Sequence, residues 1–318
     1  MKATRLDLGA IREARAAIAA GVALRTPLVR LNVWDAPADI YLKLENLQPI
    51  GSFKIRGAGF AMSQMTPAEL AKGVLVASAG NMAQGAAFNA RRLGVPCTVI
   101  APDYAPDTKV QAIERLGGRV IKVPFDRWWQ TFTDRSYPGI DAAFVHSFDD
   151  DRVMAGNGTI GLELLEDLPD LDAVLIPWGG GGLACGIAVA LRALKPSIRI
   201  YAVEAETGAP LTASLKAREP KTVDYQPSFV DGIGSRTVFP DMLAMAMDLL
   251  DGSFTASLDE IAAALRLMAE RNRIIAEGAG AVALAVALSG KAGTGRIACV
   301  VSGGNIDLPK LAALLDQR

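Results

Sequence analysis

Lys54 stands where a lysine could act as a nucleophile. It belongs to the segment 51–57 (Gly-Ser-Phe-Lys-Ile-Arg-Gly), which follows the alternating apolar run 40–45 and precedes a segment of helical character. At the start of a helix the macrodipole disfavours an ammonium and lowers its pKa. A lysine with a lowered pKa can attack a carbonyl and form a Schiff base. The alternative is a surface lysine whose charged end lies in water, so the assignment depends on a phosphate site and a carbonyl-bearing cofactor.

Four consecutive glycines form a candidate phosphate site. Gly179, Gly180, Gly181 and Gly182 separate the buried apolar run 173–176 from a helix that extends to about residue 194. Glycines allow successive backbone N–H groups to approach an anion, and a helix N-terminus adds favourable charge. A tight turn would need one glycine rather than four, so the run favours phosphate binding. No Gly-Lys-Ser/Thr sequence is present here, which excludes a nucleotide P-loop.

Two further loops follow predicted strands. Ser78, Ala79, Gly80 and Asn81 come after the run 74–77 and open a helix, so their amides could hold a carboxylate, although Asn81 could also be a helix cap. The segment Ser302-Gly303-Gly304-Asn305 follows the run 297–301, and there the Ser302 hydroxyl could meet a heteroaromatic nitrogen or cap the last helix. In open α/β sheets ligands bind outside the carboxyl ends of the strands, where all these loops would lie.

A dinucleotide site is a competing interpretation of the glycine run. Gly179, Gly181 and Ala184 fit the pattern G-x-G-x-x-A, and Glu204 ends the next predicted strand. These are the positions of residues that bind a pyrophosphate and a ribose in nicotinamide-dependent dehydrogenases. This hypothesis leaves Lys54 and Ser302 without a role.

The predicted elements that position these residues alternate between strand and helix. The predicted strands are 40–45, 74–77, 97–100, 120–123, 143–145, 173–176, 199–203 and 297–301, and helical patterns separate most of them. The predicted helices include 8–20, which ends at Gly21, one that starts at the capping pattern 66–69 (Thr-Pro-Ala-Glu), one from the loop 78–81 to residue 93, and 258–271. Such alternation predicts an α/β fold with twisted, parallel-rich sheets covered by helices on both faces.

Composition excludes several classes of protein. The 318 residues carry a formal net charge of −1, which favours neither nucleic acid nor an anionic membrane as a partner. The start has no signal-peptide core, and the apolar run 279–288 is too short to span a bilayer. Cys97, Cys185 and Cys299 are scattered, so we expect reduced thiols and a cytoplasmic protein. The single histidine, His146, is predicted to be a partnered core residue, which removes Ser-His-Asp triads from consideration.

Taken together and in order, the four motifs resemble those of the fold-type II pyridoxal phosphate enzymes. The resemblance is greatest to the threonine/serine dehydratase and serine racemase branch, and it covers nearly the whole chain. The further matching segments are Thr26-Pro27-Leu28, 42–48 (Leu-Lys-Leu-Glu-Asn-Leu-Gln), 156–159 (Gly-Asn-Gly-Thr), Asp231-Gly232 and 277–280 (Glu-Gly-Ala-Gly). The resemblance implies a two-domain, tryptophan synthase β-like fold, with residues 1–68 and 147–318 in a large cofactor-binding domain and residues 69–146 in a small mobile domain.

The resemblance also implies a role for each motif. Lys54 would be the Schiff-base lysine of pyridoxal 5′-phosphate, with Phe53 beside the cofactor. Asn81 would bind the ring hydroxyl of the cofactor, and Ser302 would face its pyridine nitrogen. The loop 78–81 would bind the carboxylate of an amino-acid substrate. The phosphate would be held by Gly179, Gly180, Gly181, Gly182 and the amide of Leu183.

The implied reaction is the elimination of water from a β-hydroxy-α-amino acid such as threonine or serine, which yields a 2-oxo acid and ammonia. Racemases of this branch have a serine at the position of Ala79, which acts as an acid or base opposite the lysine. Because Ala79 has no proton to give, the sequence favours a dehydratase over a serine or aspartate racemase. An inactive scaffold that binds the cofactor is the non-enzyme alternative.

Four further departures from the family lead to smaller expectations. Met82 replaces a usual histidine and could alter the pocket, and Gly278 replaces a usual proline and would loosen one wall near the site. In related racemases a glutamate and a downstream aspartate hold a divalent ion. Glu204 matches the glutamate, but Pro210 stands at the position of the aspartate, so Glu204 is expected to bind a monovalent cation or water instead. The pair Trp128 and Trp129 is expected to pack on the small domain or at an oligomer contact. A homodimer is the expected assembly.

Overall fold

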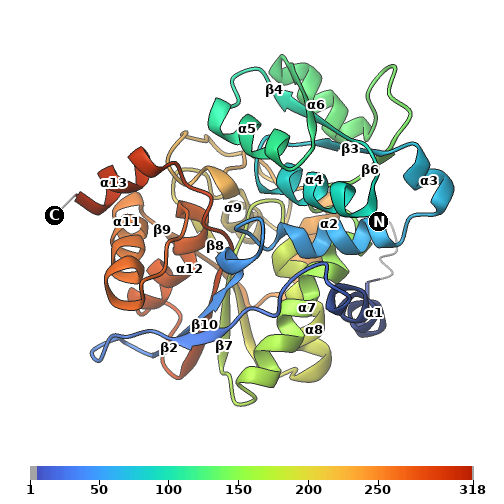
Figure 1. Cartoon of the computed structure of the whole chain (residues 1–318). Coiled ribbons are helices and arrows are strands. Elements are labelled where there is room, and N and C mark those ends of the chain that lie inside the picture. The colour runs from blue at the N-terminus through green and yellow to red at the C-terminus, as the bar shows by residue number, and fades with distance from the viewer. Residues whose placement is uncertain (1–5, 317–318) are drawn as a thin grey trace.

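The computed structural model of the chain describes residues 6–316 and has two α/β domains, each built on its own sheet (Figure 1). The large domain contains a six-stranded sheet in the order β1-β2-β10-β7-β8-β9, and the small domain contains a four-stranded sheet in the order β5-β4-β3-β6. All strand pairs are parallel except β1 with β2. The predicted α/β class and the parallel-rich sheets are therefore confirmed.

The strands of the large sheet come from both ends of the chain. Their bounds are β1 Leu28–Arg30, β2 Asp39–Leu44, β7 Ala173–Pro177, β8 Arg199–Ala205, β9 Gly252–Ala256 and β10 Arg296–Val301. Strand β10 lies between β2 and β7. This placement brings the segment after β2, which contains Lys54, next to the end of the last strand.

Helices cover both faces of the large sheet. They are α1 Leu8–Ala19, α2 Lys54–Ser63, α7 Asp151–Asp167, α8 Gly182–Leu194, α9 Pro210–Ala217, α10 Pro240–Leu249, α11 Leu258–Leu267, α12 Gly278–Leu288 and α13 Leu308–Asp316. Leu175 packs in one buried cluster with α11 and α12, whereas its neighbours Val174 and Ile176 pack in another with α7 and α8. This alternation is what a strand buried on both faces requires.

The small domain repeats this arrangement on a smaller scale. Its strands are β3 Val74–Ala77, β4 Cys97–Pro102, β5 Arg119–Val123 and β6 Ala143–Phe144, and its helices are α3 Pro67–Ala71, α4 Asn81–Leu93, α5 Asp107–Arg115 and α6 Phe125–Asp134. Thr66 and Glu69 form the predicted capping box at the start of α3. Trp128 packs against Phe125 and Phe132 within α6, as expected, but Trp129 also makes an edge-on contact with Phe239 of the large domain.

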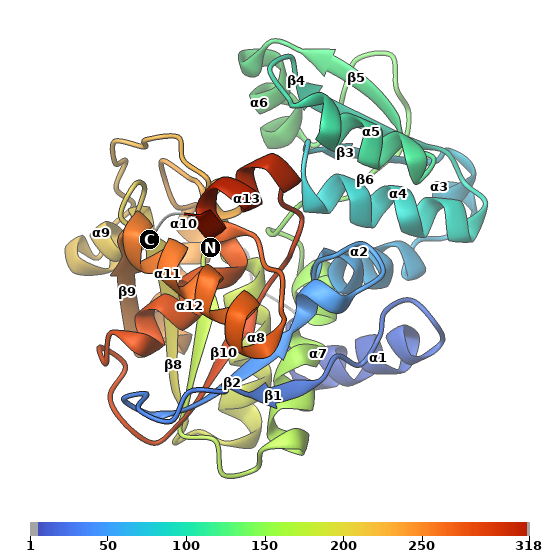
Figure 2. The ribbon, with the colours of Figure 1, turned by 60° about the vertical axis from the view of Figure 1, so that its left-hand side comes forward.

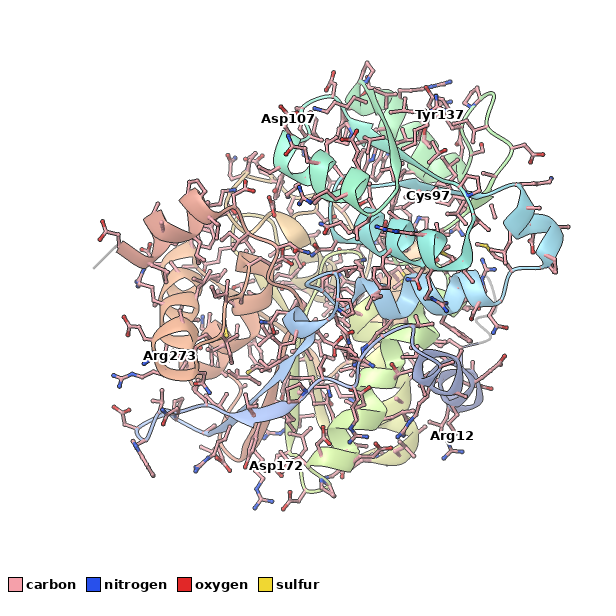
Figure 3. All side chains as sticks on the ribbon, in the orientation of Figure 1. Arg12, Cys97, Asp107, Tyr137, Asp172 and Arg273 are labelled. Carbon is pink, nitrogen blue, oxygen red and sulfur yellow. The ribbon has the colours of Figure 1, made fainter. Side chains whose placement is uncertain are left out.

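The carboxyl ends of the large sheet point toward the small domain. Asp172, which precedes β7, lies at the far end of the large domain, whereas Cys97 lies within the small domain (Figure 3). Seen after rotation, the small domain lies beyond these strand ends and is joined to the large domain near α2 (Figure 2). The predicted loops therefore gather between the two domains. Within residues 6–316, no helix is long and apolar enough to cross a membrane.

Candidate active site

Lys54 is the first residue of α2, as predicted. Its part-buried side chain extends so that Nζ donates a hydrogen bond to the carbonyl oxygen of Ser147, at 2.7 Å, and lies 5.1 Å from the centre of the Phe53 ring. The pKa of Lys54 falls to about 8, and the cause is burial, which disfavours the ammonium. The predicted lowering is present, but desolvation rather than the helix macrodipole accounts for it.

This lowered pKa predicts how the cofactor-free protein reacts with a small aldehyde. Since only the neutral amine attacks a carbonyl, the rate at Lys54 should rise with pH and reach half its maximum near pH 8. An ordinary lysine, with a pKa near 10.4, would still be almost fully protonated there. Borohydride trapping at a series of pH values, followed by peptide mass spectrometry, measures this rate. A short lysine peptide is the control, and a Lys54 profile that matches the peptide would contradict the lowered pKa.

A buried ion network fixes the helix that begins with Lys54. Arg56 is fully buried, and its guanidinium lies 2.8 Å from a carboxylate oxygen of Glu45 and 2.6 Å from one of Glu163. Lys43, also fully buried, lies 2.6 Å from the other oxygen of Glu163. Burial alone would raise the pKa of Glu45, but the charge and hydrogen bonds of Arg56 hold it below its usual value. The network ties α2 to β2 and α7, and so sets the position of Lys54.

The glycine run forms the turn between β7 and α8. Gly181 has the left-handed φ of +94°, which favours glycine. The other glycines are required by close packing: a Cβ at Gly180 would lie 2.0 Å from the Phe148 ring, and one at Gly182 would lie 2.7 Å from the Phe148 carbonyl oxygen. The need for several glycines was predicted from phosphate binding alone. The structure adds a steric reason that comes from the protein itself.

The backbone donors of this turn can hold an anion. Within residues 6–316, the N–H groups of residues 179–183 donate to no protein acceptor, and no side chain caps α8. A helix of this length with an uncapped N-terminus attracts negative charge, and successive glycine amides can converge on one phosphate. Part of the turn is open to solvent. The donor set therefore fits a phosphate group.

One short segment joins the glycine turn to Lys54. Ser147 accepts the hydrogen bond of the Lys54 amine, and the next residue, Phe148, packs on Gly180 and Gly182. The amine and the phosphate donors therefore lie on the two sides of the segment 147–148. An aldehyde that also carries a phosphate could reach both.

Ser302 lies at the end of β10, beside the lysine segment. The backbone N–H of Phe53 donates to the carbonyl oxygen of Ser302 at 3.0 Å, and Ser52 pairs with Gly303 in an isolated antiparallel bridge. The Ser302 hydroxyl is buried and has one long hydrogen bond, 3.4 Å, to the carbonyl oxygen of Ala279. A better partner, such as a ring nitrogen, could therefore compete for this hydroxyl.

The loop 78–81 approaches from the small domain. Asn81 begins α4, and no side chain caps that helix. The Ser78 hydroxyl accepts the N–H of Gly80 at 3.2 Å, and Ala79 between them presents a methyl group. An uncapped helix start can bind a carboxylate, which agrees with the predicted substrate loop.

Two residues without a predicted role bind the Asn81 side chain. Its amide nitrogen donates to Glu277 at 2.8 Å, and its amide oxygen accepts from Asn305 at 2.7 Å. Burial raises the pKa of Glu277 to about 7, against the lowering effect of its bond to Asn81. Both residues belong to motifs quoted for the family resemblance, and that membership was the one signal that could have identified them.

The Glu204 carboxylate binds the protein's own backbone, which leaves no free oxygen for a ribose. Its carboxylate accepts hydrogen bonds from the backbone N–H groups of Leu211 and Thr212, at 2.9 and 2.8 Å, and so caps α9. The proposed ribose contact is wrong, because both oxygens serve the helix. Among the described residues, no group of three or more His, Cys, Asp or Glu side chains is arranged to hold a metal ion. A cation at Glu204 stays a prediction.

The structure also locates three residues with smaller expectations. Met82 is buried in a hydrophobic cluster between α2 and the small domain, and its effect on the pocket stays a prediction. A Cβ at Gly278 would lie 2.8 Å from the carbonyl oxygen of Phe229, so the two backbones pack closely there, and the loosening of the wall stays a prediction. His146 is a buried, partnered residue as predicted: its Nδ1 accepts the N–H of Asp149 at 2.8 Å, and burial lowers its pKa to about 3.

A buried amine with a lowered pKa, beside unpaired backbone donors that suit a phosphate, defines a class of enzyme that holds a phosphorylated aldehyde through a lysine. The chain belongs to the family of pyridoxal-phosphate dependent enzymes, because the family model of that description matches residues 20–303. Its cofactor is therefore pyridoxal phosphate, and its two-domain architecture is the predicted fold-type II. A dinucleotide-dependent dehydrogenase is excluded by this assignment.

The chain is also similar to individual members of this family. It is 39% identical over 282 residues to an L-threonine ammonia-lyase of Thermotoga maritima, covering 88% of this chain and 70% of that protein. It is 42% identical over 282 residues to an L-threonine ammonia-lyase of Geobacter sulfurreducens, covering 87% and 70%. The structure of maize serine racemase matches with a TM-score of 0.88 and 31% identity, covering 97% of this chain and 96% of that one.

Proposed function

We propose that this enzyme eliminates water from a β-hydroxy-α-amino acid, such as threonine or serine. The resulting enamine then takes up water and yields a 2-oxo acid and ammonia. The observation that carries the proposal is that Lys54 has a part-buried amine, bonded to the Ser147 carbonyl and with a pKa lowered to about 8, whereas Ala79 in the loop 78–81 offers no proton. The relatives named L-threonine ammonia-lyase support the same reaction.

The proposal gives each part of the site one task. Bound pyridoxal phosphate supplies a ring that accepts electrons from the bond broken at the substrate α-carbon. The amides of residues 179–183 bind the phosphate, Asn81 donates to the ring hydroxyl, and Ser302 faces the ring nitrogen. The start of α4 binds the substrate carboxylate, and Phe53 packs beside the cofactor.

Lys54 moves the proton. The neutral amine of Lys54 would accept the α-proton of a bound substrate at Nζ, which its lowered pKa favours near neutral pH. The Ser147 carbonyl keeps Nζ directed into the site. Racemisation would need a second group that returns a proton to the opposite face. Ala79 cannot do so, and this separates the proposal from a racemase in spite of the structural likeness to maize serine racemase.

The decisive experiment is a panel of β-hydroxy amino acids. We expect purified protein to be yellow and to release 2-oxo acid from at least one member of the panel. The unreacted substrate should keep its original chirality. A yellow protein that releases no 2-oxo acid from any member would instead indicate a scaffold, and a product of inverted chirality would indicate a racemase.

Ala79→Ser tests the assignment of the second face. A hydroxyl at this position should raise racemisation of serine at least about tenfold, a fraction of what a placed acid or base contributes. Chiral chromatography of unreacted serine measures it. Ala71→Ser, on an exposed residue of α3, is the matched control and should leave chirality unchanged. Equal racemisation by both variants would show that the absence of a hydroxyl at Ala79 is not what prevents racemisation.

We further propose that residues 69–146 move as a unit against residues 1–68 and 147–318, and that the enzyme is a cytoplasmic homodimer. The three free cysteines, all buried, support a reducing compartment. The side chain of Trp34, which is 93% exposed, supports a contact with a second copy. Binding of a monovalent or divalent cation near Glu204 also remains a proposal.

A further inference from the structure

Both polar atoms of the Asn81 side-chain amide form hydrogen bonds with residues of the other domain. Asn81 belongs to the small domain, whereas Glu277 precedes α12 and Asn305 follows β10 in the large domain. The bond to Glu277 is 2.8 Å and the bond from Asn305 is 2.7 Å. The start of α4 does not require either of these two side-chain hydrogen bonds, so they need another explanation.

The hydrogen bonds that connect Asn305, Asn81 and Glu277 can run in only one direction, with each side-chain nitrogen as the donor. Asn305 Nδ2 donates to the carbonyl oxygen of Ile50 at 2.8 Å, and a backbone carbonyl can never donate. The nitrogen of Asn305 must therefore face Ile50, and its second hydrogen is directed to Asn81 Oδ1. This leaves Asn81 Nδ2 on the side of Glu277, whose Oε1 accepts one of its two hydrogens.

The second hydrogen of Asn81 Nδ2 is the one available to a ligand. Among the described residues, Glu277 is its single protein acceptor. The surroundings are crowded with backbone: a Cβ on Gly303 would lie 2.3 Å from Glu277 Oε1 and 3.3 Å from Asn81 Nδ2. Gly303 follows Ser302, so the Asn81 amide nitrogen lies next to the strand end that carries the serine predicted to face the cofactor ring.

We propose that Asn305 and Glu277 are positioning residues that fix the direction of the Asn81 amide, so that an N–H rather than a carbonyl faces the ring hydroxyl of the cofactor. This inference rests on the proposed cofactor role of Asn81. Reversal of the amide would present an oxygen to the ring oxygen, and two acceptors repel each other. The ionised form of Glu277 holds the amide more firmly, and the bond to Asn81 favours that form.

Asn305→Asp tests the direction directly, because it keeps the shape and removes the donor. The carboxylate cannot donate to Ile50 or to Asn81, so the Asn81 amide turns to offer its N–H to residue 305. We expect the dissociation constant for pyridoxal phosphate to rise about tenfold, the equivalent of one hydrogen bond, and the visible absorption bands of the bound cofactor to change. Equilibrium dialysis and absorption spectra of the reconstituted protein measure both.

Asn46→Asp is the matched control. Asn46 donates to the carbonyl oxygen of Ile275 at 2.9 Å in the large domain and makes no hydrogen bond to Asn81. It should shift neither the spectrum nor the dissociation constant by more than about twofold. A second measurement uses Glu277→Gln, which keeps an acceptor oxygen and should retain the wild-type spectrum at pH 7, whereas Glu277→Ala should not.

The double variant separates positioning from a general loss of structure. In an Asn81→Ala background, Asn305→Asp should change cofactor affinity less than twofold, because the amide it directs is gone. Equal effects with and without Asn81 would overturn the inference, as would an Asn305→Asp protein with the wild-type spectrum and affinity. A wild-type protein that binds no pyridoxal phosphate would overturn the proposed function, and this inference with it.

Discussion

Replacing Lys54 by alanine is expected to lower turnover by at least about 10³-fold, because the variant loses both the covalent attachment and the base. The amine lies 2.7 Å from the Ser147 carbonyl in a region that lowers its pKa to about 8. Release of 2-oxo acid measures turnover, and borohydride followed by mass spectrometry measures attachment of the cofactor.

Lys72→Ala is the matched control for this variant. Lys72 pairs with Asp141 on the surface of the small domain, and its side chain is 54% exposed. The control should retain wild-type turnover and should still be labelled at Lys54. Wild-type turnover by the Lys54→Ala protein would refute the mechanism, and a cofactor-sized mass on another lysine would relocate the attachment site.

Replacing Arg56 by methionine is expected to destabilise the protein by about 3–5 kcal/mol. The change leaves the carboxylates of Glu45 and Glu163 buried without their main counter-charge. Burial then raises the pKa of Glu45, whereas Arg56 now holds it below the usual value, so the variant should lose least stability at low pH, where the Glu45 carboxylate is protonated. Urea unfolding of the cofactor-free protein at two pH values measures the difference.

Arg30→Met is the surface counterpart of this substitution. Arg30 pairs with Asp39 at 2.6 Å, but its side chain is 64% exposed, so the loss should stay within about 1 kcal/mol. If Arg56→Met cost no more than Arg30→Met, the buried network would not be what holds α2 in place. Turnover measured beside stability shows whether a displaced Lys54 accompanies the loss.

Features with a local cause were predictable from sequence. The capping residues Thr66 and Glu69 marked the start of α3, and Gly21, with a φ of +99°, follows the end of α1 as predicted. β3 and α4 have the predicted bounds, 74–77 and 81–93, because β3 is a short, continuous apolar run and Gly94, in the left-handed conformation, ends α4. The predicted helix 258–271 was close, but it divides into α11 and the π-helical turn Met268–Asn272.

Features with a non-local cause were missed. β9 lies at the edge of the large sheet, where it pairs with β8 alone, and its sequence Gly-Ser-Phe-Thr-Ala has no strong apolar run. α9 lay in a stretch without an assigned element, because its cap comes from the side chain of Glu204 on β8. Likewise, the contacts of Asn81 with Glu277 and Asn305 join residues 196 and 224 positions apart, so no local pattern reveals them.

The site residues themselves were predictable because parallel strands end together. Lys54, Asn81, Ser302 and the glycine turn all follow strands, and the fold brings the carboxyl ends of those strands to the region between the domains. Motif likeness then suggested a role for each. What sequence could not supply was the packing: Phe148 against the glycine turn was visible only once the chain was folded.

The position of β10 determines the order in which the two sheets can form during synthesis of the chain. All strands of the small sheet lie within residues 74–144, so that sheet can form early on the ribosome, where domains fold as units. The large sheet cannot be completed at that stage, because β10 (residues 296–301), which pairs with both β2 and β7, has not yet been synthesised. We expect a nascent chain to capture no cofactor until translation is nearly complete. A chain that stops before residue 296 would expose the edges of β2 and β7 and would tend to aggregate.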